Sequence, residues 1–233
     1  MLRSLSLAAL LGGLILSASA QAVDVDPATY GYPITNPFEA TIATTPPQMR
    51  PYLPSEDDIR QSDYSLTLRP EREFTLPANF WAVKKLTYRM ARQDHPAPLM
   101  FLIAGTGAPY NSSLNEYLKK LFYQAGYHVV QLSSPTSYDF MSAASRFATP
   151  GISQYDAEDL YHVMQAVRAQ QADVPVTDYY LSGYSLGALD AAFVSHLDET
   201  RKSFNFKKVL MLNPPVNLYT SISNLDKLVQ TEV

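Results

Sequence analysis

The sequence of 233 residues contains no cysteine. No disulfide can therefore form, and a bacterial lipid anchor has no cysteine to which it could be attached. Positive charge is also scarce, because 18 Lys and Arg residues stand against 22 Asp and Glu residues, for a formal net charge of −4. This balance argues against nucleic acid as a partner.

An apolar run lies within the first twenty residues. Arg3 supplies a short positive segment, residues 5–16 are apolar, and residues 18–20 form a small-residue cleavage pattern. A membrane-spanning helix needs about 20 apolar residues, so this run is too short to cross a bilayer. The sequence predicts a signal peptide over residues 1–20, cut after Ala20. We expect a periplasmic or secreted protein without a stable membrane anchor.

Residues 21–62 are rich in proline, which interrupts any helical pattern. The aromatic side chains of this segment, such as Tyr30 and Phe38, favour partial docking over full disorder. We expect an extended arm, either laid over the domain as a strap or left as a disordered leader. One domain, over residues 63–233, is expected to follow it.

The pattern of apolar residues in that domain predicts two kinds of strand. Residues 64–68 and 83–90 alternate with a period of two, which is typical of antiparallel strands at a sheet edge. Residues 99–103, 127–132 and 208–212 are continuous apolar runs, which are typical of strands buried on both faces.

Segments with apolar residues at helical spacing lie between these strands. Residues 111–126 and 154–170 each carry one apolar face, and residues 133–153 predict a long polar loop between them. Strands that alternate with helices predict an α/β fold, in which a mostly parallel sheet is covered by helices on both faces and the antiparallel strands lie at its edge.

The most informative stretch is Gly183-Tyr184-Ser185-Leu186-Gly187, which follows the apolar strand end at residues 179–181. Glycines two residues before and after Ser185 allow a strand and a helix to pack closely around a strained turn. Such a turn exposes the serine hydroxyl and directs the N–H groups of the helix start at developing negative charge. The pattern predicts that Ser185 is a nucleophile. A glycine-rich turn that matches the motif by chance is the alternative.

With this stretch the chain resembles the α/β-hydrolase superfamily, and within it the serine esterases and lipases. The family has its serine elbow after the fifth strand, where Ser185 stands, and an oxyanion loop after the third. Ala104-Gly105-Thr106-Gly107 occupies the place of that loop, with alanine where histidine is usual. The resemblance implies an oxyanion hole made by the backbone N–H groups of Leu186 and Thr106, with Gly107 as the alternative to Thr106.

The resemblance implies an exported serine hydrolase that cleaves a carboxylic ester, of a small molecule or a lipid, through an acyl-enzyme on Ser185. It implies no cofactor and no metal. A dinucleotide site at Gly105-Thr106-Gly107 is excluded, because Tyr110 stands where a third glycine would be needed and no acid ends the next strand. A non-catalytic binding protein on the same fold, with the Pro-rich arm as its interaction element, is the second hypothesis.

A nucleophilic serine needs a base, and in this family the acid and then the histidine follow the serine along the chain. Of the four histidines only His196 follows Ser185, and eleven helical residues place it roughly 16 Å away. His95, His128 and His162 are expected to be solvated or structural.

We therefore expect a chain that is truncated at its C-terminus. The acid, the histidine and the last strands of the fold would lie beyond Val233, and the strand at residues 208–212 would lie at the edge of the sheet. An unpaired sheet edge with exposed apolar side chains favours aggregation.

Asp190 falls on the side of the elbow helix that faces the sheet. A buried carboxylate needs partners, so we expect a loop or a tyrosine to hydrogen-bond it, the alternative being a catalytic acid. Asp139 and Arg146 lie in the predicted loop and are expected to be solvated, the alternative being a place in the substrate pocket.

Overall fold

The structure, a computed structural model, describes residues 31, 33–43, 45–69 and 84–230. The predicted signal peptide lies outside the described residues. The chain divides into two units, one ending at Pro51 and the other beginning at Tyr52. This division precedes residue 63, where the sequence pattern places the start of the domain.

The described part of the first unit contains two short helical elements, α1 (Pro37–Ala43) and the 3-10 helix η1 (Pro47–Met49). The side-chain oxygen of Asn36 accepts the N–H groups of Phe38 at 2.9 Å and Glu39 at 3.2 Å, and so caps α1. The proline-rich composition predicts an extended arm here, whereas residues 37–43 form α1. Proline is favourable, not disruptive, at the first position of a helix.

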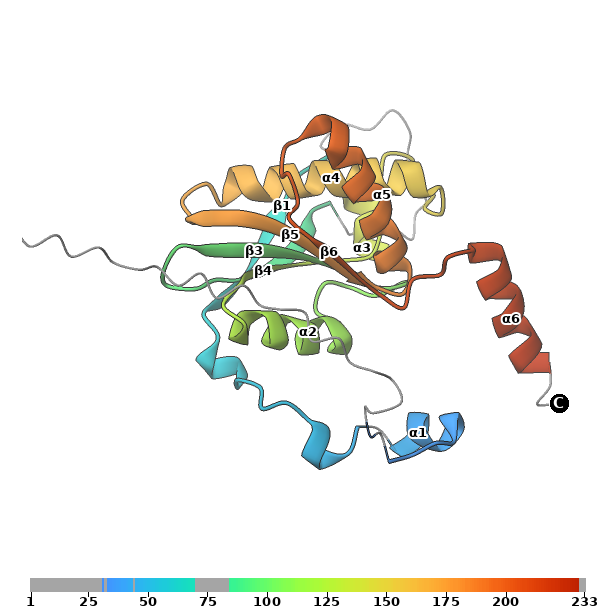
Figure 1. The fold of residues 1–233 in the computed structure, drawn as a ribbon. Coiled ribbons are helices and arrows are strands. Elements are labelled where there is room, and N and C mark those ends of the chain that lie inside the picture. The colour runs from blue at the N-terminus through green and yellow to red at the C-terminus, as the bar shows by residue number, and fades with distance from the viewer. Residues whose placement is uncertain (1–30, 32, 44, 70–83, 231–233) are drawn as a thin grey trace, which may run out of the picture. The chain divides into compact units, whose positions relative to one another are not determined.

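The second unit is built on a six-stranded sheet with the order β1-β2-β4-β3-β5-β6 (Figure 1). The antiparallel strands β1 and β2 form one edge, and the other four strands are parallel. This arrangement confirms the predicted sheet. The strands are β1 (Gln61–Leu66), β2 (Leu86–Ala91), β3 (Ala97–Ile103), β4 (His128–Leu132), β5 (Val176–Tyr184) and β6 (Val209–Leu212).

Helices cover both faces of the sheet, as the sequence predicted (Figure 1). α2 (Ser113–Gln124) lies on one face, and α4 (Ser153–Gln170) and α5 (Leu186–Arg201) pack together on the other. The predicted loop at residues 133–153 contains a short helix, α3 (Tyr138–Ala143). Six residues are too few to show a helical period, which is why the sequence analysis missed it.

β3 passes through the middle of the core. Leu99, Phe101 and Ile103 belong to the apolar cluster on the side of α4, whereas Leu102 belongs to the cluster that contains Leu118 of α2. Successive side chains of a strand point to opposite faces, and here both faces are covered. The continuous apolar run therefore indicated correctly that this strand is buried on both sides.

β6 is the outer strand on the other side of the sheet, as predicted. Its Leu210 and Met211 are 46% and 45% exposed. A further helix, α6 (Leu218–Gln230), follows it and contains no buried residue. No helix is predicted from the sequence at this position. None of the helices in the described ranges is both long and apolar enough to cross a membrane.

Candidate active site

Ser185 lies between β5 and α5 in a strained backbone conformation, with φ 53° and ψ −125°. A residue with a side chain rarely adopts such angles, and strain of this kind is concentrated at functional sites. Its backbone N–H donates to the carbonyl oxygen of Leu212 in β6 at 2.9 Å, which fixes the turn to the sheet. The side chain is exposed. The predicted positive φ and the predicted exposure of the hydroxyl are both confirmed.

Gly183 and Gly187 allow the strand and the helix to meet at this turn. A Cβ atom on Gly183 would lie 2.1 Å from the carbonyl oxygen of Gly187. A Cβ atom on Gly187 would lie 2.4 Å from the carbonyl oxygen of Ala104. Contacts this short are impossible, so neither position accepts a side chain without moving backbone. The first turn of α5 therefore packs directly against both β5 and the end of β3.

The loop after β3, residues 104–112, lies beside the elbow, and we call it the β3 loop. A Cβ atom on Gly105 would lie 3.2 Å from the Cβ atom of Ser185. The N–H of Ala108 donates to the carbonyl oxygen of Gly105 at 3.0 Å, and Gly107 has φ 68°. These features are typical of a type II turn with glycine at its third position.

Two backbone N–H groups beside Ser185 have no hydrogen-bond partner within the described ranges, those of Leu186 and Thr106. The N–H of Gly107 donates to the Thr136 side-chain oxygen at 2.7 Å. Thr106 is therefore the more suitable of the two donors that the resemblance proposed in this loop. The catalytic roles of Ser185, Leu186 and Thr106 remain predictions.

All four histidines lie in the described part of the chain, and none hydrogen-bonds to Ser185. His196 is exposed and lies 3.2 Å from Glu199, and His162 is exposed on α4. The ring of His95 is 3.0 Å from the carbonyl oxygen of Pro96. These contacts agree with the prediction that none of them is the base for Ser185.

His128 is the one histidine of the four that is fully buried. Its Nδ1 accepts the N–H of Gln93 at 3.0 Å, and its Nε2 lies 3.3 Å from the carbonyl oxygen of Pro175. Burial lowers the pKa of His128, which favours the neutral ring. It links three segments of backbone, so its role is structural.

Asp190 is buried on α5, one turn after the elbow, with 1% of its surface exposed. Its Oδ2 atom has no hydrogen-bond partner within the described part of the chain. Burial, and to a smaller extent the nearby charge of Asp156, raise the pKa of Asp190 to about 8. The expected burial is confirmed. The expected bond from a loop or a tyrosine is wrong, because the first turn of α4 brings a second carboxylate there instead.

Asp139 and Arg146 have structural contacts. Asp139 accepts the hydroxyl groups of Ser133 at 2.7 Å and Ser137 at 2.6 Å. The backbone N–H of Arg146 donates to Asp159 at 2.7 Å. Both residues therefore hold the segment between β4 and α4 in place.

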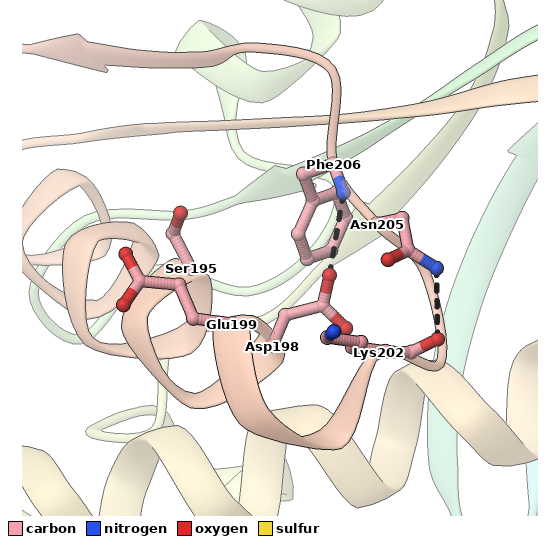
Figure 2. Close-up of a pocket in the computed structure, with 6 residues that line it drawn as sticks. All are labelled: Ser195, Asp198, Glu199, Lys202, Asn205 and Phe206. Atoms are coloured by element: carbon pink, nitrogen blue, oxygen red, sulfur yellow. Dashed lines mark hydrogen bonds between the residues drawn. The ribbon is translucent and has the colours of Figure 1, made fainter.

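A pocket of about 310 Å³ lies at the C-terminal end of α5, at the opposite end of the helix from Ser185 (Figure 2). Its buried acid, Asp198, accepts the hydroxyl of Tyr161 at 2.6 Å and the N–H groups of Phe204 at 3.1 Å and Phe206 at 3.2 Å. Each oxygen of the carboxylate accepts at least one of these bonds, and Asp198 thereby fastens the end of α5 to the next segment. Nothing in this pocket resembles a catalytic arrangement.

Comparison with solved structures identifies the fold. An esterase from Pyrococcus furiosus matches 74% of this chain and 56% of its own, with a TM-score of 0.54 and 14% identity. The chain has the α/β-hydrolase fold. Brefeldin A esterase, a bacterial homologue of human hormone-sensitive lipase, matches 82% of this chain and 51% of its own, with a TM-score of 0.51 and 15% identity.

The α/β-hydrolase match covers only part of these enzymes. This chain spans about half the length of the solved structures that it matches. No family model and no curated protein matches the sequence. At 14 and 15% identity, this structural likeness establishes the fold alone. The chemistry follows from the site.

Proposed function

We propose that this chain carries the nucleophile and the oxyanion donors of an exported serine hydrolase, which cleaves a carboxylic ester through an acyl-enzyme on Ser185. The observation that carries the proposal is the elbow itself. An exposed serine at φ 53° is held between two glycines that admit no side chain. A protein without a use for this strained turn would gain stability by relaxing it.

The proposed reaction begins when Ser185 Oγ attacks the ester carbonyl and a base takes its proton. The negative charge that develops on the carbonyl oxygen is stabilised by the N–H groups of Leu186 and Thr106, which have no hydrogen-bond partner among the described residues. The alcohol leaves, and water then attacks the acyl-enzyme to release the acid and restore the serine. The substrate is a small-molecule or lipid ester, and export is proposed from the N-terminal sequence pattern.

The base needs a separate proposal. None of the four histidines hydrogen-bonds to Ser185, and His128 is engaged on both ring nitrogens. We propose that a histidine and its acid from outside these 233 residues complete the site. The structural likeness to two esterases supports an ester as the bond cleaved.

The experiment is ester hydrolysis by the full-length protein. Ser185→Ala should abolish turnover of a p-nitrophenyl ester and leave the unfolding temperature nearly unchanged, because the side chain is exposed. Ser203→Ala, which removes an exposed hydroxyl at the far end of α5, is the matched control and should retain activity. Equal turnover in the wild type and Ser185→Ala would refute the proposal.

A non-catalytic binding protein on the same fold is the second candidate. The observation that favours it is that the Ser185 hydroxyl has no hydrogen-bond partner in the described part of the chain, so nothing there activates it. A full-length protein that folds but hydrolyses no ester and forms no acyl-enzyme would support this candidate.

A further inference from the structure

The loop after β4, residues 133–137, contains buried hydroxyl side chains that the proposed reaction does not use, and we call it the β4 loop. Ser133 and Ser134 are 0% exposed and Ser137 is 2% exposed. A buried hydroxyl without a partner costs roughly 1–3 kcal/mol, so such groups are retained where they have bonds to make. In this chain the hydroxyl of Ser133 bonds to the β3 loop, which lies beside Ser185, and two further bonds join the same two loops.

Three hydrogen bonds join the two loops. They run from Gly107 N–H to Thr136 Oγ1 at 2.7 Å, from Tyr110 N–H to Ser133 Oγ at 2.9 Å, and from Ser134 N–H to the carbonyl oxygen of Ala108 at 3.0 Å.

The bond from Gly107 differs from the other two, because it acts on the peptide group that joins Thr106 to Gly107. The orientation of this peptide group distinguishes a type II turn from a type I turn. Gly107 has φ 68°, the value of the type II form, and its N–H points at Thr136 Oγ1. The hydroxyl of Thr136 thus favours one of two orientations that the glycine would otherwise exchange.

The Thr136 side chain is itself held in place. Its Oγ1 lies 2.8 Å from the hydroxyl oxygen of Ser134, which also accepts the backbone N–H of Thr136 at 3.3 Å. On the other side of the β3 loop, Gly105 packs against the ring of Tyr184 and against Ser185. The β3 loop is therefore fixed between the elbow and the β4 loop.

We infer that Thr136 is a positioning residue for the oxyanion hole. By accepting the N–H of Gly107 it anchors the β3 loop at the residue after Thr106, and so holds the preceding peptide group, with the unpartnered N–H of Thr106, in place beside the elbow. Thr136 acts through Gly107 and needs no contact with the substrate. This inference rests on the proposed function, and it adds a side chain to a hole that the resemblance describes with backbone groups alone.

The test compares Thr136→Val with Thr136→Ser in the full-length protein. Valine keeps the shape of threonine and removes the acceptor, so we expect kcat to fall about tenfold with KM changed by less than about twofold, since the loss of a whole oxyanion donor costs 10²–10³-fold. Serine retains the acceptor and should restore kcat to within about twofold of the wild type. Thr200→Val, at the far end of α5, is the matched control and should leave kcat unchanged.

Two results would overturn the inference: an unchanged kcat in Thr136→Val, or a loss that Thr136→Ser does not restore. Unfolding temperatures of all variants show whether each is folded at the assay temperature. Ser185→Ala, measured alongside, distinguishes a failure of the proposed function from a failure of the positioning role of Thr136. If Ser185→Ala retains activity, the proposed function fails. If Ser185 is essential and Thr136→Val has wild-type kcat, only the positioning role fails.

Discussion

Lys119 and Asp190 are buried ionisable side chains on opposite faces of the sheet, and their surroundings differ completely. Lys119 of α2 is 0% exposed, and its ammonium donates to Glu56 at 2.8 Å, to Gln61 at 2.7 Å and to Glu116. Asp190 of α5 is 1% exposed, and its Oδ2 has no partner among the described residues. The ammonium of Lys119 thus has hydrogen-bond acceptors around it, whereas Oδ2 of Asp190 has no donor among the described residues.

The difference shows two ways in which a fold accommodates a buried ionisable group. The partners of Lys119 stabilise its charge and tie the turn at Glu56 and the edge strand β1 to α2. Although burial raises it, hydrogen bonds from Lys119, Lys120 and Gln61 lower the pKa of Glu56 to about 2. Asp190, by contrast, is accommodated by losing its charge, because burial raises its pKa to about 8. The uncompensated group lies on the helix that begins at the proposed nucleophile.

Removal of Lys119 should have the largest effect on stability. Lys119→Met keeps the apolar stem and removes a buried ammonium to which Glu56, Gln61 and Glu116 are hydrogen-bonded. We therefore expect a loss of about 3 kcal/mol in the free energy of unfolding, measured by urea denaturation. Lys120→Met removes a partly exposed ion pair with the same Glu56 and should cost less than about 1 kcal/mol. Equal losses in the two variants would mean that burial of the charge is not what matters.

Neutralisation of Asp190 should raise the free energy of unfolding at high pH, whereas removal of Lys119 lowers it. A pKa raised from 3.8 to about 8 means that the folded state binds the proton more tightly, so stability is greatest below about pH 4 and falls as the pH rises to about 8. Asp190→Asn should flatten this decline and be more stable than the wild type at pH 9. The measurement is urea denaturation at several pH values.

Asp156 bears on the same experiment, because burial raises its pKa as well. It should account for part of the decline that remains in Asp190→Asn. Asp226→Asn, on the exposed surface of α6, is the control and should follow the wild-type curve. An Asp190→Asn curve parallel to the wild type would show that Asp190 is charged throughout this range.

The smallest expected effect is at Glu56, whose side chain is 46% exposed. Because the pKa of Glu56 falls from 4.5 to about 2 on folding, its contribution is present above pH 4.5 and is lost as the pH falls toward 2. Glu56→Gln should lack this acid-dependent loss, which solvent screening limits to about 1 kcal/mol or less. If Glu56→Gln and the wild type lost stability identically as the pH falls, the lowered pKa of Glu56 would be contradicted.

The sequence predicted what depends on local pattern. The apolar run of β3 and the glycines around Ser185 each carry their own signal over a few residues, and both gave the right structure. α6 also carried a signal, since Ile222, Leu225 and Val229 recur at helical spacing, and it was missed.

Contacts between distant segments could not be predicted in this way. Lys119 is separated from Glu56 by 63 positions and from Gln61 by 58, and no local pattern pairs them. The neighbour of Asp190 was hidden for the same reason, because it depends on how α4 packs against α5. Thr136 meets Gly107 across 29 positions, so its part in the site also required the structure.

The central claim is that Ser185 is an activated nucleophile, and a fluorophosphonate probe tests it most directly, since only an activated serine reacts. The full-length protein is treated with the probe, digested, and the modified peptide is located by mass spectrometry. The account predicts a single adduct on Ser185 and none in Ser185→Ala. An unmodified Ser185 in the folded, full-length protein, or an adduct on another serine, would contradict it.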